Sequence, residues 1–168
     1  MSVTAGTTKL PNRTLSMGTG ALTVSGGTFQ QNGAALTTGG LTLTAGTYAV
    51  GGGSLAVNGA ASFAVSADLS SATALSFGST VGVTGGTLKL PARTIGMTGA
   101  LTINGGTFQQ SGAALTTGGL TVSAGTYTVG ASSLTVTGAA SVAVSTDLSA
   151  ATSLAFQSTL AVTGGTFK

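Results

Sequence analysis

Residues able to carry chemistry are few in this chain, and they recur at fixed spacing. The 168 residues include five lysines and arginines and two carboxylates, with no histidine, cysteine or tryptophan. Without imidazole or thiol groups, a chain has no Ser-His-Asp triad, no thiolate nucleophile and no imidazole metal site. We therefore expect a protein that is not an enzyme and that holds no cofactor or metal.

The charges come in matching sets. Asp68 and Asp147 lie in the similar contexts AVSADLSSAT and AVSTDLSAAT, and each is followed 21 residues later by a lysine, Lys89 or Lys168. We expect Asp68 with Lys89, and Asp147 with Lys168, to form ion pairs along one edge of the molecule. Exposed ion pairs contribute about 0–1 kcal/mol, so these pairs are either ordinary surface contacts or marks that set the register of a subunit contact.

A long internal repeat explains this spacing. GGTFQQNGAALTTGGLTLTAGTYAV at 26–50 returns as GGTFQQSGAALTTGGLTVSAGTYTV at 105–129. The chain therefore divides into repeats 1–80 and 81–159, and 160–168 begins a third copy, since VTGGTFK matches VTGGTLK and VTAGTTK. Repeats of this kind are typical of stacked architectures. We interpret 1–168 as a single domain.

Each long repeat contains four units of 19–21 residues. Aligned at fixed offsets, the units give apolar columns at their third, eighth and fifteenth positions. The third column reads Val3, Val24, Leu43, Ala64, Val83, Ile103, Val122, Ala143; the eighth reads Thr8, Phe29, Tyr48, Leu69, Leu88, Phe108, Tyr127, Leu148; the fifteenth reads Leu15, Leu36, Leu55, Leu75, Ile95, Leu115, Leu134, Leu154. Columns of this kind arise where equivalent positions lie above one another.

Within a unit, apolar and polar residues alternate, as in Leu22-Thr-Val24-Ser, and the residues are those that favour strands. Glycine-rich turns follow at once. We predict an all-β protein, a parallel β-solenoid of about eight coils, with Pro11 and Pro91 at a corner because proline cannot donate to a strand ladder. Four coils then separate Asp68 from Asp147 by roughly 19 Å at about 4.8 Å per coil, whereas a glycosidase pair requires about 5–9.5 Å.

Other classes fit the composition less well. Disordered chains are usually rich in charge and poor in aliphatic residues, whereas only 4% of this chain is charged. No stretch approaches the roughly 18 apolar residues of a membrane helix, and the start, MSVTAGTTKLPNR, has no apolar signal-peptide region. An antiparallel barrel would require aromatic girdles. The net charge of +3 rests on five basic residues, so we expect no nucleic-acid partner.

Two surface features leave further roles open. The Phe/Tyr column of Phe29, Tyr48, Phe108 and Tyr127 would stack on sugars if it faced outward, although its leucine members favour core packing. Pairs such as Thr42/Thr44, Thr23/Ser25 and Thr135/Thr137 resemble the ice-binding face of solenoid antifreeze proteins. In our alignment that array is interrupted by Phe63, Val65, Gly82 and Asn104.

Units of the form L-T-V-x-G-G-T-F resemble those of secreted bacterial β-helix proteins, namely filamentous-haemagglutinin-type exoproteins and autotransporter passenger repeats. The resemblance covers essentially the whole chain and implies a right-handed parallel β-helix, an extracellular or cell-surface location, and a role in adhesion, matrix or fibres. It carries no specific functional residue to this sequence. Phage tail fibres use similar solenoids and remain an alternative.

A solenoid without polar caps exposes a strand edge at each end, and neither end of this sequence departs from the repeat pattern. Two explanations compete: the chain is a slice of a longer array, or it is a subunit that stacks end to end. We expect a structural protein, a fibre subunit or segment that assembles head to tail with copies of itself, with ice-binding or glycan-binding activity as the alternative. The expected contact joins the last half-coil to the first coil of the next copy through Val3, Thr8, Leu10, Leu15, Leu160, Val162, Thr166 and Phe167.

Overall fold

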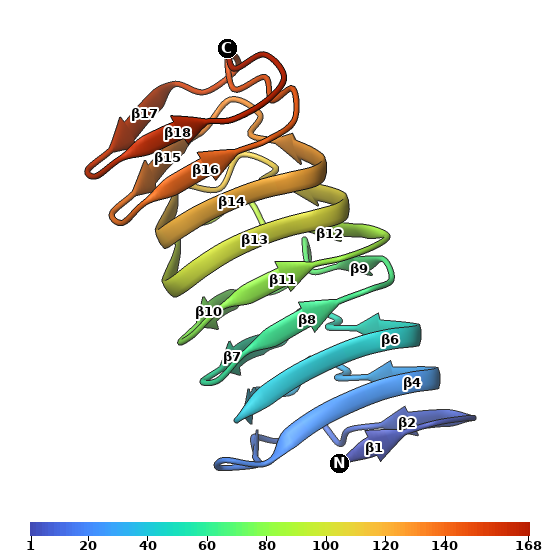
Figure 1. Cartoon of the computed structure of the whole chain (residues 1–168). Helices are drawn as coiled ribbons and strands as arrows, with labels where there is room; N and C mark the ends of the chain where they lie inside the picture. The colour runs from blue at the N-terminus through green and yellow to red at the C-terminus, as the bar shows by residue number, and fades with distance from the viewer.

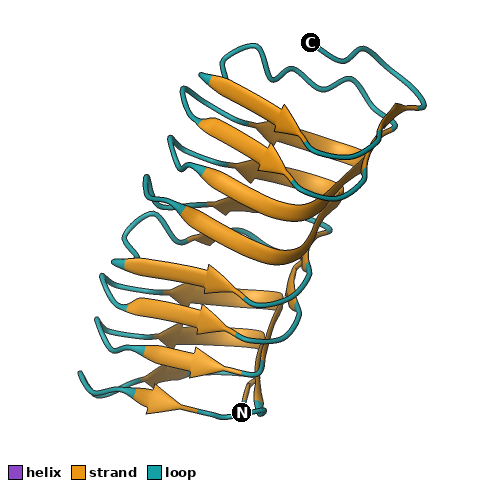
Figure 2. Cartoon of the chain, turned by 90° about the vertical axis from the view of Figure 1, so that its left-hand side faces the viewer, coloured by secondary structure: helices purple, strands orange, loops and turns teal.

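The computed structural model describes residues 1–168 as one continuous β-solenoid. Its 18 strands belong to a single sheet in which every pairing is parallel and joins a coil to the next coil along the chain. The sheet winds through about eight turns, with the two termini at opposite ends of the stack (Figures 1 and 2). The predicted fold class is confirmed. The structure contains no helix long and apolar enough to cross a bilayer.

Each complete coil has three short β-runs, and we call the surfaces they form the first, second and third faces. On the first face lie β1 (Ser2–Val3), β8 (Ala61–Phe63), β11 (Val81–Val83), β16 (Ala140–Val142) and β18 (Leu160–Val162). On the second lie β2 (Thr7–Lys9), β9 (Ala67–Asp68) and β12 (Thr87–Lys89). On the third lie β3 (Leu15–Ser16), β5 (Leu36–Thr38), β7 (Ser54–Val57), β10 (Ala74–Phe77), β15 (Ser133–Val136) and β17 (Ser153–Phe156).

The remaining strands bend around corners and so belong to more than one face. The strands β4 (Ala21–Gln30) and β6 (Gly40–Ala49) cover the first and second faces. The strands β13 (Ile95–Gln109) and β14 (Leu115–Thr128) begin on the third face and continue over the other two. Pro11 and Pro91 fall in the turn between the second and third faces, outside every strand, as predicted.

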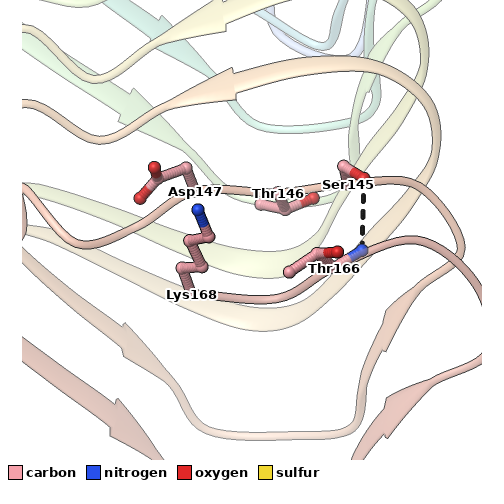
Figure 3. A pocket seen from close by; sticks show the side chains of 5 residues that line it. All are labelled: Ser145, Thr146, Asp147, Thr166 and Lys168. Carbon is pink, nitrogen blue, oxygen red and sulfur yellow. Dashed lines mark hydrogen bonds between the residues drawn. The ribbon is translucent and has the colours of Figure 1, made fainter.

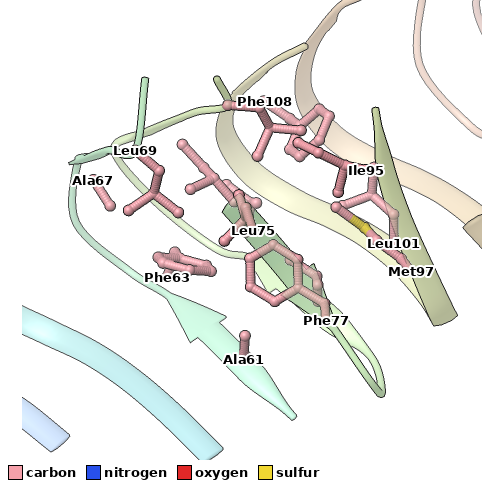
Figure 4. Packing of buried hydrophobic residues seen from close by; sticks show 14 of the residues in the cluster. Ala61, Phe63, Ala67, Leu69, Leu75, Phe77, Ile95, Met97, Leu101 and Phe108 are labelled. Carbon is pink, nitrogen blue, oxygen red and sulfur yellow. The ribbon is translucent and has the colours of Figure 1, made fainter. Parts of the chain in front are cut away.

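Strand pairing places equivalent side chains above one another and fills the interior with apolar columns. The predicted third-face column is confirmed through its whole length, with Leu15 opposite Leu36, Leu36 opposite Leu55 and, at the other end, Leu134 opposite Leu154. The aromatic column is also interior, because Phe29 and Phe108 are fully buried. It therefore packs the core and is not a sugar-stacking surface (Figure 4 shows the interior near Phe108).

Glycines with positive φ form the bend between the first and second faces. Gly27, Gly46 and Gly106 have φ of 64°, 81° and 66°. A Cβ on Gly106 would lie 2.4 Å from the carbonyl oxygen of Gly86 in the coil below. Both the backbone conformation and the close approach of successive coils therefore require glycine at this corner.

The fourth coil of each repeat has no glycine at this bend, and there our alignment was wrong by one residue in the third column and by two in the eighth. Leu43 pairs with Phe63, not Ala64, and Val122 pairs with Val142, not Ala143. The bend after Phe63 is one residue shorter than the others, and the following turn is one residue longer. Leu88 therefore lies opposite Ala67 instead of Leu69, while Leu69 and Leu148 belong to the next column, as Leu69 N donates to Lys89 O and Leu148 N to Lys168 O.

At these bends without glycine, a serine hydroxyl accepts a hydrogen bond from the backbone of the next coil. Thr87 N donates to Ser66 Oγ over 3.0 Å, and Thr166 N donates to Ser145 Oγ over 3.1 Å. The half-coil 160–168 is thus attached to the second repeat in the same way that 81–89 is attached to the first.

Candidate functional site

The ends of the solenoid are the candidate site, and at the C-terminal end the apolar columns are open. Leu160 is 38% exposed, Val162 46% and Leu154 39%. Phe167 is half-buried against Phe156, with ring centroids 6.0 Å apart. The inward-facing residues of the last half-coil and of β17 form an apolar surface at this end. At equivalent positions inside the stack, the next coil along the chain covers such residues, as Ile103 lies opposite Val83.

The N-terminal residues that we predicted for the contact are less accessible. Val3 is 2% exposed and Leu10 7%, whereas Thr8 and Leu15 are half-buried. These side chains turn inward beneath the second coil, with Val3 opposite Val24 and Thr8 opposite Phe29. Their contribution to a contact therefore comes chiefly from the backbone edge of the coil. The structure places the two predicted sets, Val3 to Leu15 and Leu160 to Phe167, at opposite ends of the molecule (Figure 1).

Two end-face residues were missing from the sequence prediction. Leu154 and Phe156, on β17, continue the inward-facing positions of Leu134 and Val136, and no further third-face strand covers them. Leu154 was already the last member of the predicted fifteenth column. Its position in the final complete coil was the signal that would have identified it.

The charged residues form an edge beside the second face. Lys89 Nζ lies 3.7 Å from Asp68 Oδ2, and both side chains are substantially exposed. Hydrogen bonds from the Ser70 side chain and backbone, with Lys89 as a weaker contributor, hold the pKa of Asp68 below its usual value. Hydrogen bonds from Ser149, and then the charge of Lys168, do the same for the pKa of Asp147.

Asp147 and Lys168 lie near each other without closing an ion pair. They line a polar hollow at the C-terminal end together with Ser145, Thr146 and Thr166 (Figure 3). No hydrophobic residue lines this hollow. Thr166, predicted for the axial contact, is exposed here and faces away from the apolar columns.

Hydroxyl groups form regular columns on the outside of the first and second faces. Strand register places one side chain per coil in the first-face column, which reads Ser2, Thr23, Thr42, Ser62, Gly82, Thr102, Thr121, Ser141 and Ala161. The outward second-face column reads Thr7, Thr28, Thr47, Ser66, Thr87, Thr107, Thr126, Ser145 and Thr166.

This register removes Phe63 from the outward array of the sequence alignment and confirms the interruption at Gly82. The fourth-coil equivalent of Thr42 is Ser62, since Phe63 is buried, and Ala64 follows it on the outer surface. Thr135, which we had grouped with Thr42, lies on the third face, opposite Thr116. The first face therefore carries a more regular hydroxyl surface than we predicted.

Comparison with known proteins adds no assignment: no family model, no curated protein and no solved structure matches the chain.

Proposed function

We propose that the protein is a structural, non-enzymatic segment of an extracellular fibre or matrix, extended end to end by addition of β-strands from further copies. The observation that carries the proposal is the open apolar end formed by Leu154, Leu160 and Val162. Burying a whole Leu or Val side chain stabilises by about 1.5–3 kcal/mol. The partly exposed residues would each recover roughly 1 kcal/mol on being covered.

Backbone groups at the two ends support the same proposal. The outermost strands, β1 to β3 and β17 to β18, are each paired on one side only. Exposed strand edges are templates for pairing with another chain. A contact between two different end surfaces does not close on itself, so repetition of the contact produces a filament.

Charge placed on the apolar columns should block this assembly. We expect Val162→Lys combined with Phe167→Lys to keep the rod folded and to abolish elongation, because two buried ammonium groups would face the next copy. Ala161→Lys is the matched control, since this side chain lies on the outward first-face column. Sedimentation velocity and negative-stain electron microscopy measure the outcome, and unchanged fibre length in the double variant would contradict the proposal.

The extracellular location rests on the resemblance to secreted β-helix repeats. Antibody labelling of intact producing cells tests it, and labelling confined to permeabilised cells would count against it.

Ice binding is a second candidate because the outward first-face column carries a hydroxyl in every coil except at Gly82 and Ala161. We expect that an ice-binding chain would show thermal hysteresis, and that Thr42→Lys would abolish it. Thr37→Lys on the third face is the control. A wild-type chain without hysteresis or ice shaping eliminates this candidate.

A further inference from the structure

The two end half-coils are copies of one unit. Residues 1–9 read MSVTAGTTK and residues 160–168 read LAVTGGTFK, and both resemble the interior half-coil 81–89, VGVTGGTLK. Strand register places Val3 and Val162 in one column, and residues 1–9 and 160–168 each supply one first-face run and one second-face run. A continuous solenoid has room for only one of them at each junction.

Simple stacking of one molecule on another would leave a gap. If residues 1–9 of the next copy were added above residues 160–168, the first and second faces would gain one layer more than the third. The strand β17 of one copy and β3 of the next would then lie two layers apart, at about 4.8 Å per layer, with no strand between them. Leu154 and Phe156 would remain uncovered, and backbone groups on both strands would lack partners.

The interior of the chain shows where such a half-coil sits. Residues 81–89 pair with residues 101–109 of β13, with Val83 opposite Ile103 and Leu88 opposite Phe108. The sequence of 101–109, LTINGGTFQ, is nearly repeated as LTVSGGTFQ at 22–30 in β4. Because 160–168 resembles 81–89, we expect it to pair with β4 of another copy.

Within each molecule, residues 1–9 already pair with β4. Their side chains match the columns of β4 less well. Thr8 lies opposite Phe29, at a position where the interior half-coil has Leu88 and the C-terminal half-coil has Phe167. Aromatic side chains already pack along this column, as Phe29 and Tyr48 stack with centroids 5.6 Å apart. Replacing Thr8 by Phe167 would continue the aromatic packing across the junction.

We propose that assembly is a strand exchange in which residues 160–168 of one copy displace residues 1–9 of the next copy from β4. The exchange rests on the proposed end-to-end assembly, and it replaces the expected contact with residues 1–9 by a contact with β4. Leu160, Val162 and Phe167 then cover Leu22, Val24 and Phe29, while β17 pairs with β3 so that Leu154 lies opposite Leu15. The solenoid is continuous except for the chain break between Lys168 and Leu10 of the next copy.

Strand exchange and simple stacking predict different axial repeats for filaments of the full chain. Exchange gives eight coils per subunit, or about 38 Å at about 4.8 Å per coil. Simple stacking gives nine layers, or about 43 Å. Helical reconstruction by electron cryo-microscopy measures this repeat. A repeat near 43 Å with a third-face gap would overturn the exchange and keep the end-to-end assembly, whereas the absence of filaments would overturn both.

Labelling of the displaced segment is an independent test, because the chain has no cysteine of its own. In a Thr8→Cys variant, we expect thiol labelling to be roughly tenfold faster in filaments than in the monomer, since a released segment loses its protection. Thr47→Cys, on an exposed second-face position of an interior coil, is the control and should label equally in both states. Slower labelling of Thr8→Cys in filaments would show that residues 1–9 stay in place and would overturn the exchange.

Discussion

The same seven-residue motif occupies two different environments in this molecule. VTGGTLK at 83–89 lies inside the stack, where Val83 is fully buried, whereas VTGGTFK at 162–168 lies at the end, where Val162 is 46% exposed. Both segments make the same serine hydrogen bond with the coil below, through Ser66 or Ser145. Val83 lies opposite Ile103 of the next coil, whereas no further coil covers Val162, and this explains the difference in burial. Burial in this fold is a property of position in the stack, and an end coil carries the sequence of an interior coil without its environment.

Truncating an aromatic residue of the same column should give the largest difference in lost stability between the interior and the end. We expect Phe108→Ala to lower the free energy of unfolding by about 3–5 kcal/mol, because it leaves a cavity in a fully buried column. Phe167→Ala should cost less than half as much, since Phe167 is half-buried and has a covering coil on neither the first nor the second face. Urea unfolding followed by circular dichroism measures both. Equal losses would mean that the end coil is packed as tightly as the interior.

Glycine substitutions test the close approach of coils at almost constant backbone conformation. Gly106 and Gly6 both have φ of 66°, but a Cβ on Gly106 would meet Gly86 O at 2.4 Å and one on Gly6 would meet nothing within 4 Å. We expect Gly6→Ala to cost about 1–2 kcal/mol from the left-handed conformation alone. Gly106→Ala should cost about 1–3 kcal/mol more because of the added overlap.

Thermal and urea unfolding of these two variants provide the comparison. Gly96→Ala is the neutral control, because its Cβ also meets nothing within 4 Å and its φ is not positive. If Gly106→Ala and Gly6→Ala lost equal stability, stacking of the glycine corner would not be the constraint.

Alkaline pH should destabilise the interior through its two tyrosines. Burial raises the pKa of Tyr48 and Tyr127 far above the ordinary value. The stabilisation is present below about pH 10, the pKa of an unfolded tyrosine, and is lost as pH rises. Each tyrosine that ionises only on unfolding lowers the free energy of unfolding by about 1.4 kcal/mol per pH unit. Urea unfolding between pH 9 and pH 11.5 measures this slope.

Replacing both tyrosines by phenylalanine should flatten the pH dependence. The variant should also be less stable at neutral pH, because Tyr48 and Tyr127 donate to Gln31 Oε1 and Gln110 Oε1 over 2.6 Å, and an unsatisfied buried acceptor costs about 1–3 kcal/mol. If the slope of unfolding free energy against pH were unchanged in this variant, groups other than the two tyrosines would cause the alkaline loss of stability.

Substitutions of the two carboxylates, Asp68 in the interior and Asp147 near the end, should show the smallest difference in lost stability. Asp68→Asn should lower stability by less than about 1 kcal/mol, because its ion pair with Lys89 is exposed. Asp147→Asn should have the weaker effect, since it forms no ion pair. Both carboxylates have lowered pKa values, so their contribution is present at neutral pH and is lost as pH falls through the folded pKa. Stability measured at pH 7 and pH 3 tests this, and a larger loss for Asp147→Asn would contradict the account.

The sequence predicted the coil but not every register within it. The leucines from Leu15 to Leu154 recur at nearly constant spacing, so their column was correctly predicted. The predicted register of the fourth coils was wrong because Ala-Val-Ser there replaces the glycine-containing bend and is one residue shorter. An alignment at fixed offsets cannot represent this change in length. The burial of Gln31 and Gln110 was also missed. Its signal was present, because each is followed 17 residues later by a tyrosine that donates to it.

At the candidate site, sequence reasoning named Leu160 and Val162, which the structure exposes, and omitted Leu154. Repetition of VTGGTFK predicted that Leu160 and Val162 would be equivalent to covered interior residues. It did not predict that Val3 and Leu10 would already be buried under the second coil. That burial depends on how the first coil pairs with the second, which requires the register seen in the structure.

Electron cryo-microscopy of the concentrated 168-residue chain tests the central claim most directly. The account predicts unbranched filaments in which strands repeat every 4.8 Å or so along the axis, and in which density covers Leu154 and Val162 at each junction. A population of monodisperse rods of about eight coils, unchanged at the highest concentration reached, would contradict it.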